Sequence, residues 1–333
     1  MHTKYKVAII GASGLVGLTV LKVLEEKAFS NVSYMLFSSN SSAGNKVHFL
    51  GEDYVLCELS DSSFNYNFDY AIFCAGSDVA EKFAPIAVSH GTTVIDNSSF
   101  FRMNPDVPLI VPEVNINEVK NSKGIISNPN CSTIQAMLVL KPLDDKYKIK
   151  RIVYSTYQAV SGAGKLAISD LETKASSDNL KAFPYPIYNN CIPQIDSFTS
   201  SGYTKEELKM INETRKILHD ENLRITATTV RVPVLNSHSE SINVELNNPF
   251  ELKDIFTLFE NTPGLTLYDN VNELKYPTPL EISGKDDVYI GRIRRDFSVD
   301  NGLNLWVVAD NIRKGAALNA VQIAEVLINN NWL

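Results

Sequence analysis

The sequence predicts an α/β protein in which a parallel-sheet domain of alternating strands and helices comes first and a second, α+β domain follows. Two observations lead to this prediction. An apolar run at residues 5–10 ends in a glycine-rich turn and is followed by an amphipathic helical pattern, the order of elements in a parallel βαβ unit. Beyond residue 150 apolar and polar residues alternate in strand-like fashion, which is typical of antiparallel sheets.

Composition sets the broad class of the protein. A length of 333 residues favours about two domains, and 21% charged with 44% apolar residues is ordinary for a soluble protein. The net charge of −7 argues against a general nucleic-acid or membrane binder. No apolar stretch reaches the roughly 18 residues of a membrane span, and the first apolar run is too short for a signal peptide.

The spacing of the cysteines bears on the redox environment in which the protein works. Cys57, Cys74, Cys131 and Cys191 are widely spaced, and this spacing matches neither a zinc site nor a disulfide framework. We therefore expect a protein of the reducing cytoplasm that holds no metal.

The first element is a buried strand at residues 5–10, and the turn at residues 11–17 carries three glycines. Gly11 permits the tight turn, Gly14 lets the backbone approach a pyrophosphate, and Gly17 allows the helix to pack closely on the strand. This order predicts a Rossmann-type dinucleotide-binding unit. The alternative is a helix-capping turn that binds no ligand.

The second strand, at residues 32–37, ends in a serine-rich loop at residues 38–44. NAD-specific sites usually place a carboxylate there for the ribose 2′-hydroxyl, and none occurs between residues 27 and 51. A carboxylate would repel a 2′-phosphate, whereas serine hydroxyls can donate hydrogen bonds to it, so NADP is favoured over NAD. No arginine supports this choice, and a plain serine loop remains the alternative.

Two further strands are predicted at residues 68–74 and 92–96, with a helix at residues 79–89 between them. Gly76 and Arg102 follow the ends of these strands, where ligands gather in open α/β sheets. Arg102 could therefore hold an anion, or it could be a surface arginine that pairs with a carboxylate.

Cys131 lies where a turn enters a helical pattern at residues 134–140. Free backbone N–H groups and the helix dipole at such a position favour a thiolate, which is a nucleophile. The alternative is a buried structural cysteine.

In the second half, a strand at residues 151–157 ends in a small-residue loop at residues 158–164, and a helix follows. Thr204 and Glu207 have the spacing of a capping box at the start of a later helix. Glu206 and Lys209 share one face of that helix, either as part of a site or as a solvated ion pair.

Strands predicted at residues 226–234 and 238–246 flank a turn at residues 235–237, and they carry Arg231 and His238. A long amphipathic helix is predicted at residues 312–327 and is expected to pack on the first domain. Cysteine, histidine and a nicotinamide cofactor together suit aldehyde chemistry through a thioester, in which the thiolate adds to the carbonyl carbon and histidine takes the hydroxyl proton.

The sequence resembles the aspartate-β-semialdehyde dehydrogenase family over essentially the whole chain. The motifs that carry the resemblance are residues 11–17, residues 96–99 with Arg102, residues 111–115, 128–133, 158–164 and 192–196, residues 231–234 followed by His238, residues 291–294 and residues 309–311. The cysteine motif and the Arg…His motif together are highly specific.

The resemblance implies a fold like that of glyceraldehyde-phosphate dehydrogenase. Residues 1–130 with 312–333 would form the NADP-binding Rossmann domain, and residues 131–311 the catalytic and dimerisation domain. Cys131 would be the thioester nucleophile, His238 the acid/base, and Gln158 a residue that positions the substrate.

The resemblance also implies how substrate and cofactor are held. Arg231 would grip the α-carboxylate, Glu206 would receive the α-ammonium, and Arg102 and Lys209 would hold phosphate with Asn130 nearby. The residues expected to bind NADP are Gly11, Ala12, Ser13, Gly14, Leu15, Val16, Ser39, Ser41, Ser42, Gly76, Ser161, Gly162 and Asn311.

The implied reaction is the NADP-dependent reductive dephosphorylation of L-aspartyl-4-phosphate to L-aspartate 4-semialdehyde, in lysine, threonine and methionine biosynthesis. Such enzymes are typically homodimers and sometimes tetramers, with the second domain supplying the subunit contact. They bind small molecules, and we expect neither a nucleic acid nor a membrane as a partner.

Two positions depart from the family pattern. Ser41 stands where bacterial members often carry an arginine, so tolerance of NAD is expected to rise. Cys191 stands where an apolar residue is usual, and we expect it to be a small core residue.

Two alternatives remain. An N-acetyl-glutamyl-phosphate reductase shares the chemistry, but its cysteine usually follows a glycine, where this chain has Asn130; a glyceraldehyde-phosphate dehydrogenase is disfavoured because its Ser-Cys-Thr-Thr motif is absent. A non-catalytic NADP-binding redox sensor would keep the glycine turn but would not need Cys131, Gln158, Arg231 and His238 together.

Overall fold

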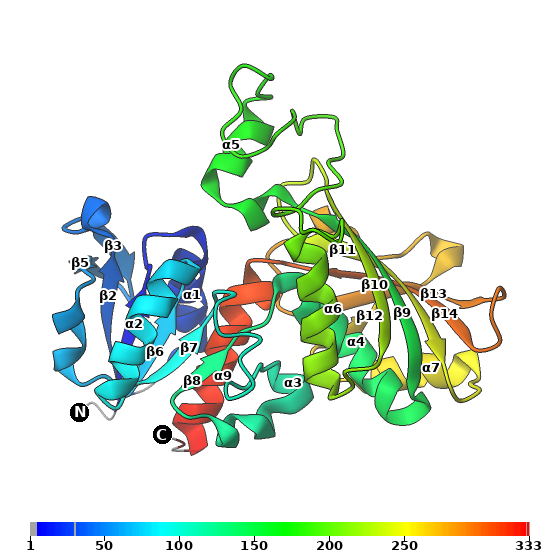
Figure 1. Cartoon of the computed structure of the whole chain (residues 1–333), viewed down its shortest axis with the longest axis horizontal. Helices are drawn as coiled ribbons and strands as arrows, with labels where there is room; N and C mark the ends of the chain where they lie inside the picture. The colour runs from blue at the N-terminus through cyan, green and yellow to red at the C-terminus, as the bar shows by residue number, and fades with distance from the viewer. Residues whose placement is uncertain (1–4, 30, 331, 333) are drawn as a thin grey trace. The chain divides into compact units, whose positions relative to one another are not determined.

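The computed structural model describes residues 5–29, 31–330 and 332, and it divides into two compact units. Unit 1 comprises the chain up to Pro129 together with the chain from Ala316 onward, and unit 2 runs from Asn130 to Gly315. Each unit is built around one six-stranded sheet (Figure 1). Among the described helices, none combines the length and the apolar character that a membrane span requires.

Unit 1 contains a parallel sheet in the order β5-β2-β1-β6-β7-β8. The chain begins at the centre of this sheet and moves outward on both sides, so the strand order reverses at β1. The strands are β1 (Tyr5–Ile10), β2 (Val32–Ser38), β5 (Cys57–Glu58), β6 (Tyr70–Phe73), β7 (Thr93–Asp96) and β8 (Ile125–Ser127).

Helices cover both faces of this sheet, because successive side chains of a strand point to opposite faces. Val7 and Ile9 of β1 pack in one cluster with α1 (Leu15–Lys27) and α9 (Leu318–Asn330). Their neighbours Ala8 and Ile10 pack in a second cluster with α2 (Ser77–Ser89). Smaller elements are the hairpin β3 (Lys46–Phe49) with β4 (Glu52–Val55), the helix α3 (Pro112–Asn115) and the 3-10 turns η1 (Asn40–Ser42), η2 (Asp61–Tyr66) and η3 (Ile116–Asn121).

Unit 2 contains a mixed sheet in the order β10-β9-β11-β14-β13-β12. Figure 1 shows α4 and α6 over one face of these strands and α5 in an arm that leaves the sheet. The strands are β9 (Ile149–Gln158), β10 (Arg224–Arg231), β11 (His238–Leu246), β12 (Leu265–Leu267), β13 (Val288–Asp296) and β14 (Gly302–Ala309). The helices are α4 (Cys131–Tyr147), α5 (Lys165–Glu172), α6 (Lys205–Leu218), α7 (Leu252–Glu260) and α8 (Pro279–Ile282), with 3-10 turns η4 (Val160–Ala163) and η5 (Val271–Glu273).

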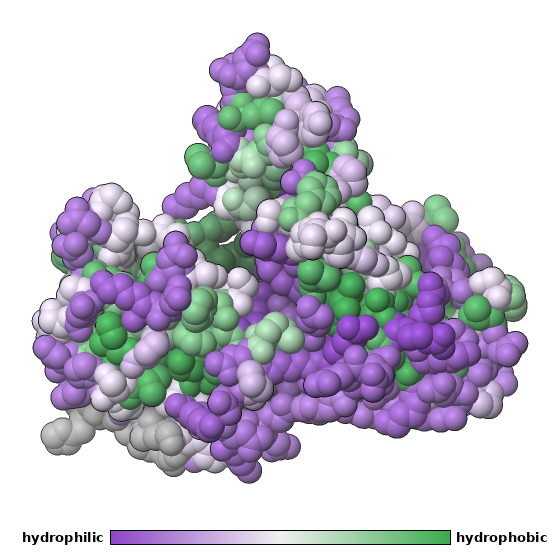
Figure 2. Space-filling model, viewed as in Figure 1, coloured by the Kyte–Doolittle hydropathy of each residue, from purple (hydrophilic) through white to green (hydrophobic). Residues whose placement is uncertain are grey.

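The arm that carries α5 has a mixed surface. Hydrophobic and hydrophilic residues are interspersed over it in Figure 2. Its exposed apolar side chains include Leu166, Tyr185 and Tyr188.

The structure corrects two expectations about elements. The region expected to be antiparallel is a mixed sheet, because β9 lies between β10 and β11 and runs parallel to β10. The last helix begins at Leu318 and not at Ile312, because the Asp310 carboxylate accepts the N–H groups of Ile312 and Arg313 and a π-helical turn, η6 (Arg313–Ala317), comes first.

A third correction concerns Cys191. It is exposed rather than a core residue, because it lies in the loop between the turn at residues 188–189 and Ile192, whose backbone bridges to Arg231. All four cysteines lie among the described residues, and none of them forms a disulfide there.

Candidate active site

The start of α4 is fixed from several directions. Cys131 is the first residue of the helix, as the sequence predicts, and its side chain is partly buried. Asn130 caps the helix, since its Oδ1 accepts the N–H groups of Ser132 at 3.0 Å and Thr133 at 3.4 Å. The backbone N–H of Asn130 donates to Oε2 of Glu213 at 2.6 Å. The residue before the cysteine is therefore held by both its backbone and its side chain.

Gly315 explains how Cys131 fits there. A Cβ atom at this position would lie 2.9 Å from Cβ of Cys131, closer than two such carbons can approach. Only glycine leaves room for the cysteine side chain at this point.

Four of the predicted site residues form one buried network on α6 and β9. Oε1 of Glu206 accepts hydrogen bonds from Nδ2 of Asn130 at 2.8 Å and from Nε2 of Gln158 at 3.1 Å. Its Oε2 forms an ion pair with Nζ of Lys209 at 3.2 Å, and the same Nζ lies 3.0 Å from Oδ2 of Asp196. Glu206 is buried, so this is not the solvated ion pair considered above.

The charges in this network stabilise each other. Burial alone would raise the pKa of Glu206, but the Lys209 ammonium and the hydrogen bonds from Gln158 and Asn130 outweigh it and hold that pKa below its ordinary value. Burial would lower the pKa of Lys209, but Glu206 and Asp196 raise it. Both groups therefore stay charged near neutral pH.

Arg231 and His238 lie around the loop after β9. Nη1 of Arg231 donates to the carbonyl oxygen of Ala159 at 2.6 Å, and the N–H of Ala159 donates to Nδ1 of His238 at 3.0 Å. A Cβ atom at Gly162 would lie 3.2 Å from Nη1 of Arg231 and 3.2 Å from Nε2 of His238. The two side chains and Gly162 therefore share one small space.

Burial and the neighbouring Arg231 hold the pKa of His238 well below its ordinary value. Burial lowers the pKa of Arg231, while Glu206 and Cys131 act in the opposite direction. Cys131 is therefore within electrostatic reach of Arg231, which joins the start of α4 to the Arg231–His238 pair.

Ser161 and Asn311 also meet in unit 2. Nδ2 of Asn311 donates to Oγ of Ser161 at 3.0 Å, and its Oδ1 accepts the N–H of Ser237 at 2.9 Å. These bonds tie the loop after β9 to the residue just before His238.

Unit 1 carries the remaining candidates at the carboxyl ends of β2, β1, β6 and β7. Gly11 has φ +82°, and a Cβ there would lie 2.8 Å from the carbonyl oxygen of Cys74. A Cβ at Gly17 would lie 2.2 Å from the carbonyl oxygen of Gly11, so these two glycines are required by the turn itself. The turn comprises Gly11, Ala12, Ser13 and Gly14, and α1 begins with Leu15 and Val16.

The N-termini of α1 and α2 are capped by glycine. Gly14 caps α1 and Gly76 caps α2, and glycine has no side chain that could bond to the first N–H groups of the helix. The backbone N–H groups at these two ends are therefore able to donate hydrogen bonds to an anion.

The serine-rich loop forms a short 3-10 turn after β2. Ser39 and Ser41 are exposed and lie 2.9 Å apart between their hydroxyl oxygens, and Ser42 closes the turn. Arg102 is buried after β7, where it donates to the carbonyl oxygens of Asn128 at 2.9 Å and Asn97 at 2.8 Å. Arg102 is therefore not the surface arginine of the alternative.

The sequence reasoning missed four groups that shape this site. Glu213 and Gly315 support Cys131 from far along the chain, and the Ala159 backbone holds both Arg231 and His238. Glu240 is completely buried beside Ser132, and burial raises its pKa well above the ordinary value. Strand alternation could have found Glu240, which lies two residues after His238, but no local signal indicates the others.

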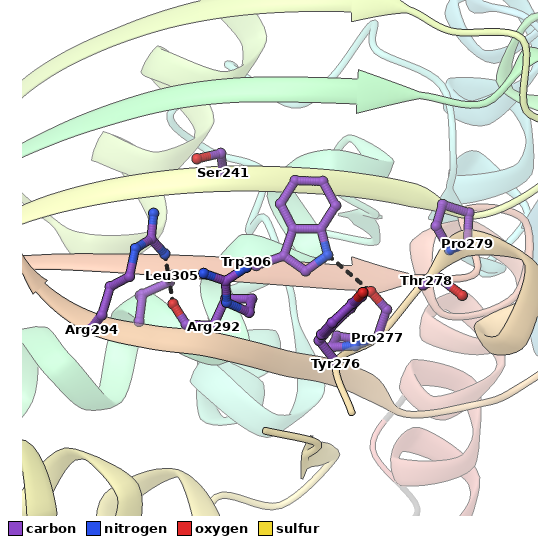
Figure 3. Close-up of a pocket in the computed structure, with 9 residues that line it drawn as sticks. All are labelled: Ser241, Tyr276, Pro277, Thr278, Pro279, Arg292, Arg294, Leu305 and Trp306. Atoms are coloured by element: carbon purple, nitrogen blue, oxygen red, sulfur yellow. Dashed lines mark hydrogen bonds between the residues drawn. The ribbon is translucent and has the colours of Figure 1, made fainter. Parts of the chain in front are cut away.

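A separate hollow of about 310 Å³ lies on the open face of the unit 2 sheet. Figure 3 shows Trp306 beside the segment from Tyr276 to Pro279, with Arg292 near Trp306 and Arg294 farther away along the strand. The indole N–H of Trp306 donates to the carbonyl oxygen of Pro277 at 2.9 Å. Among residues with described positions, no group of three or more His, Cys, Asp or Glu side chains could hold a metal ion.

Comparison with known proteins identifies the family. The family model described as "Semialdehyde dehydrogenase, NAD binding domain" matches residues 6–122, and "Semialdehyde dehydrogenase, dimerisation domain" matches residues 140–314. An aspartate-semialdehyde dehydrogenase of Aquifex aeolicus is 50% identical over 338 residues, which cover 99% of each chain.

Solved structures agree. Aspartate semialdehyde dehydrogenase II from Vibrio cholerae, complexed with ASA, is 44% identical with a TM-score of 0.90 over 98% of each chain. Aspartate semialdehyde dehydrogenase with NADP from Candida albicans is 25% identical with a TM-score of 0.79 over 99% of each chain. The predicted two-domain α/β fold is confirmed, and the chain belongs to the aspartate-semialdehyde dehydrogenase family.

Proposed function

We propose that this chain catalyses the NADP-dependent reductive dephosphorylation of L-aspartyl-4-phosphate to L-aspartate 4-semialdehyde through a thioester at Cys131. The observation that carries the proposal is the buried network in which Asn130 joins the start of the Cys131 helix to Glu206, Gln158 and Lys209. It combines a nucleophile with charged groups of both signs, which an amino-acid acyl phosphate requires.

Cys131 acts as the nucleophile. The positive end of the α4 dipole stabilises a thiolate at the first residue of the helix, and the Asn130 cap holds that residue in place. The sulfur attacks the acyl carbon, the phosphate leaves, and the acyl group remains as a thioester.

The substrate is held by its charged groups. Arg231 binds the α-carboxylate; its Nε has no hydrogen-bond partner among the described residues and is buried, so it has a donor to offer. Glu206, ionised and buried, receives the α-ammonium. Lys209 and Arg102 bind phosphate, and Asn130 lies beside the reacting group.

Gln158 and His238 act on the acyl group itself. Gln158 positions the substrate and the thioester through its amide. His238 serves as the acid/base that exchanges a proton with the substrate oxygen when sulfur or hydride adds to the carbon.

NADP fits unit 1. The glycine-capped N-termini of α1 and α2 suit a pyrophosphate, and the serine hydroxyls after β2 suit a 2′-phosphate. The residues that would hold it are Gly11 to Val16, Ser39, Ser41, Ser42 and Gly76, together with Ser161, Gly162 and Asn311 of unit 2. When bound as NADPH, the cofactor supplies the hydride that reduces the thioester.

We further propose that the protein is a cytoplasmic homodimer that serves lysine, threonine and methionine biosynthesis. The open face of the unit 2 sheet supports self-association, because Tyr157 and Trp306 remain partly exposed on it. Sedimentation of the protein and of Trp306→Asp tests this: a dimer that the substitution converts to monomer is expected. A monomeric parent protein, or a dimer that the substitution leaves intact, would remove this face as the contact, and a tetramer would add a second one.

The catalytic proposal is tested by incubating the purified protein with L-aspartate 4-semialdehyde, phosphate and NADP, with NAD in parallel. Reduction of NADP that requires phosphate is expected. Turnover of N-acetyl-glutamate semialdehyde instead would mean the same chemistry on another substrate. No turnover with either, while NADP still binds, would favour the redox-sensor alternative.

A further inference from the structure

The guanidinium of Arg102 is oriented by two backbone carbonyl groups. Arg102 follows β7 in unit 1 and is buried. Its Nε donates to the carbonyl oxygen of Asn128 at 2.9 Å, and its Nη2 donates to that of Asn97 at 2.8 Å. Because a guanidinium is planar and rigid, acceptors at two of its nitrogens fix its plane. The direction in which Arg102 presents its charge therefore depends on these two carbonyls.

The residues that supply these carbonyls are joined to each other through their side chains. Nδ2 of Asn128 donates to Oδ1 of Asn97 at 2.8 Å and to the carbonyl oxygen of Ala316 at 3.2 Å. Nδ2 of Asn97 in turn donates to the carbonyl oxygen of Phe73 at 2.8 Å. A shift of the Asn128 side chain would therefore disturb both acceptors of Arg102.

Asn319 anchors this pair from the start of α9. Its side chain is completely buried, and its Nδ2 donates to Oδ1 of Asn128 at 2.6 Å and to the carbonyl oxygen of Ile110 at 2.9 Å. The carbonyl oxygens of Ile110 and Ala316 can only accept, so they fix which way each amide points. Asn128 is consequently a donor and an acceptor at once, a combination that an ionised carboxylate does not offer. We call Asn97, Asn128 and Asn319 the amide network.

The amide network orients Arg102 without adding charge. Burial raises the pKa of the neighbouring Asp96, and the hydrogen bonds from Ser98 and the charge of Arg102 act in the opposite direction. The oxygens of Asp96 accept the N–H and the hydroxyl of Ser98 at 2.9 and 2.7 Å. A further carboxylate at residue 97 or 128 would compete with an anionic ligand for the guanidinium. Neutral amides avoid that competition, as a site for an anion requires.

We propose that Asn128 and Asn319 are positioning residues for the phosphate that Arg102 binds, so that the start of α9 belongs to the phosphate site. This inference rests on the proposed function, in which Arg102 holds phosphate. Removal of the Asn319 amide takes this donor from Oδ1 of Asn128, and the Asn128 carbonyl then loses its fixed direction toward Nε of Arg102. No local sequence pattern indicates the link, because Asn128 and Asn319 are 191 residues apart.

Phosphate titration of the purified protein, with L-aspartate 4-semialdehyde and NADP, tests the proposal. We expect Asn319→Ala to raise the KM for phosphate about tenfold, since displacing a binding group by about 1 Å can cost up to 10²-fold. The KM values for the other two substrates should change less than about twofold, because their binding groups are untouched.

Asn115 offers the matched control. It is a buried amide of unit 1 that also makes two backbone hydrogen bonds, accepting the N–H of Val111 and donating to the carbonyl oxygen of Leu109, both at 2.9 Å. Asn115→Ala should cost similar stability in thermal unfolding and leave the KM for phosphate unchanged. An equal rise of this KM in both variants would mean a general loss of stability and would overturn the inference.

A double variant tests whether Asn319 acts through Arg102. A lysine ammonium does not have the planar set of donors that the two carbonyls orient. Adding Asn319→Ala to Arg102→Lys should therefore leave the KM for phosphate where Arg102→Lys alone puts it. A further tenfold rise would show that Asn319 acts elsewhere, and the positioning role would be wrong.

The orientation of Arg102 can also be observed without turnover. In ¹⁵N spectra of arginine-labelled protein, with Arg102→Lys identifying the signal, the Nε–H of Arg102 should exchange slowly with water. In Asn319→Ala it should exchange at least about tenfold faster, because a less well held N–H opens to solvent more often. Fast exchange in the parent protein, or a rate that Asn319→Ala leaves unchanged, would overturn the inference. An inactive parent protein that shows the expected exchange refutes the proposed function and leaves the positioning of Arg102 standing.

Discussion

The helices that begin at the candidate sites of the two units are capped differently. In unit 1, α1 and α2 begin after Gly14 and Gly76, which have no side chain to bond to the first N–H groups of the helix. In unit 2, α4 begins after Asn130 and α6 after Thr204, and both caps accept hydrogen bonds from backbone N–H groups. An end that binds an anion must leave its donors free, whereas an end that presents a nucleophile must be held still.

The largest effect is expected at the N-terminus of α4, which the Asn130 cap holds in place. Cys131→Ser should reduce turnover by roughly three orders of magnitude or more, since a hydroxyl is a far poorer nucleophile at neutral pH. NADPH binding and thermal unfolding should stay unchanged, because unit 1 and the cap are untouched. The exposed thiol of Cys191 offers the matched control, and Cys191→Ser should keep full activity. Appreciable turnover by Cys131→Ser would remove this residue as the nucleophile.

The start of α1 should be destabilised by one added methyl group. In Gly17→Ala the new Cβ would lie 2.2 Å from the carbonyl oxygen of Gly11, so α1 must move away from β1. We expect a cost of about 1–3 kcal/mol in the free energy of unfolding and at least a tenfold loss of NADPH affinity, measured by urea denaturation and by titration. Gly76→Ala is the control: its Cβ meets no described atom within 4 Å, and the cost should be below about 1 kcal/mol. Equal costs would contradict the packing argument.

Glu213 allows the positioning of Cys131 to be tested separately from the stability of the fold. Glu213 and Glu207 are both buried carboxylates of α6 that accept backbone N–H groups, from Asn130 and from Thr204 and Thr229 respectively. Each alanine variant should lose about 1–3 kcal/mol of stability. Only Glu213→Ala should change the alkylation rate of Cys131, by several-fold, as measured with iodoacetamide. A similar change in Glu207→Ala would show that the effect is general.

Glu240 beneath the first turn of α4 should make stability depend on pH. Its pKa is raised in the folded state by burial, so between its ordinary value of 4.5 and the folded value only the unfolded chain loses the proton, and stability falls as pH rises. In Glu240→Gln this fall should be smaller by up to about 1.4 kcal/mol per pH unit. Urea unfolding of both proteins at two pH values in that window measures it. Parallel pH profiles would mean that Glu240 is ionised in the folded protein.

The smallest effect is expected at Ser41, in the loop next to the free end of α1. Ser41→Arg should raise NADPH affinity a few-fold and leave NADH affinity unchanged, because a guanidinium pairs with the 2′-phosphate alone and solvent screens an exposed pair. His48→Arg adds the same charge elsewhere on unit 1 and should change neither affinity. A gain with both cofactors would point to a non-specific charge effect.

Local patterns made one part of this site predictable. A few neighbouring residues specify each of three features: the glycine turn, the start of α4 at Cys131 and the Thr204–Glu207 capping box. The structure has all three. The Glu213–Asn130 bond spans 83 residues, and Gly315 reaches Cys131 from still farther along the chain. No short-range pattern reports such contacts, nor the parallel pairing of β10 with β9.

Cys191 shows the opposite failure, since the family pattern of an apolar residue at this position predicted burial. Cysteine is among the most buried residues, yet Cys191 lies in a loop and is exposed. The fold overrides an average preference where the backbone runs in a loop at the surface.

The backbone of Ala159 orients both Arg231 and His238, one through its carbonyl oxygen and the other through its N–H. Because every amino acid except proline carries both groups, a side-chain replacement that fits the buried space at residue 159 keeps the two contacts. Alanine scanning therefore passes over one of the most consequential positions of this site. Its contribution becomes visible only when the peptide group itself is altered, by proline or by an amide-to-ester exchange.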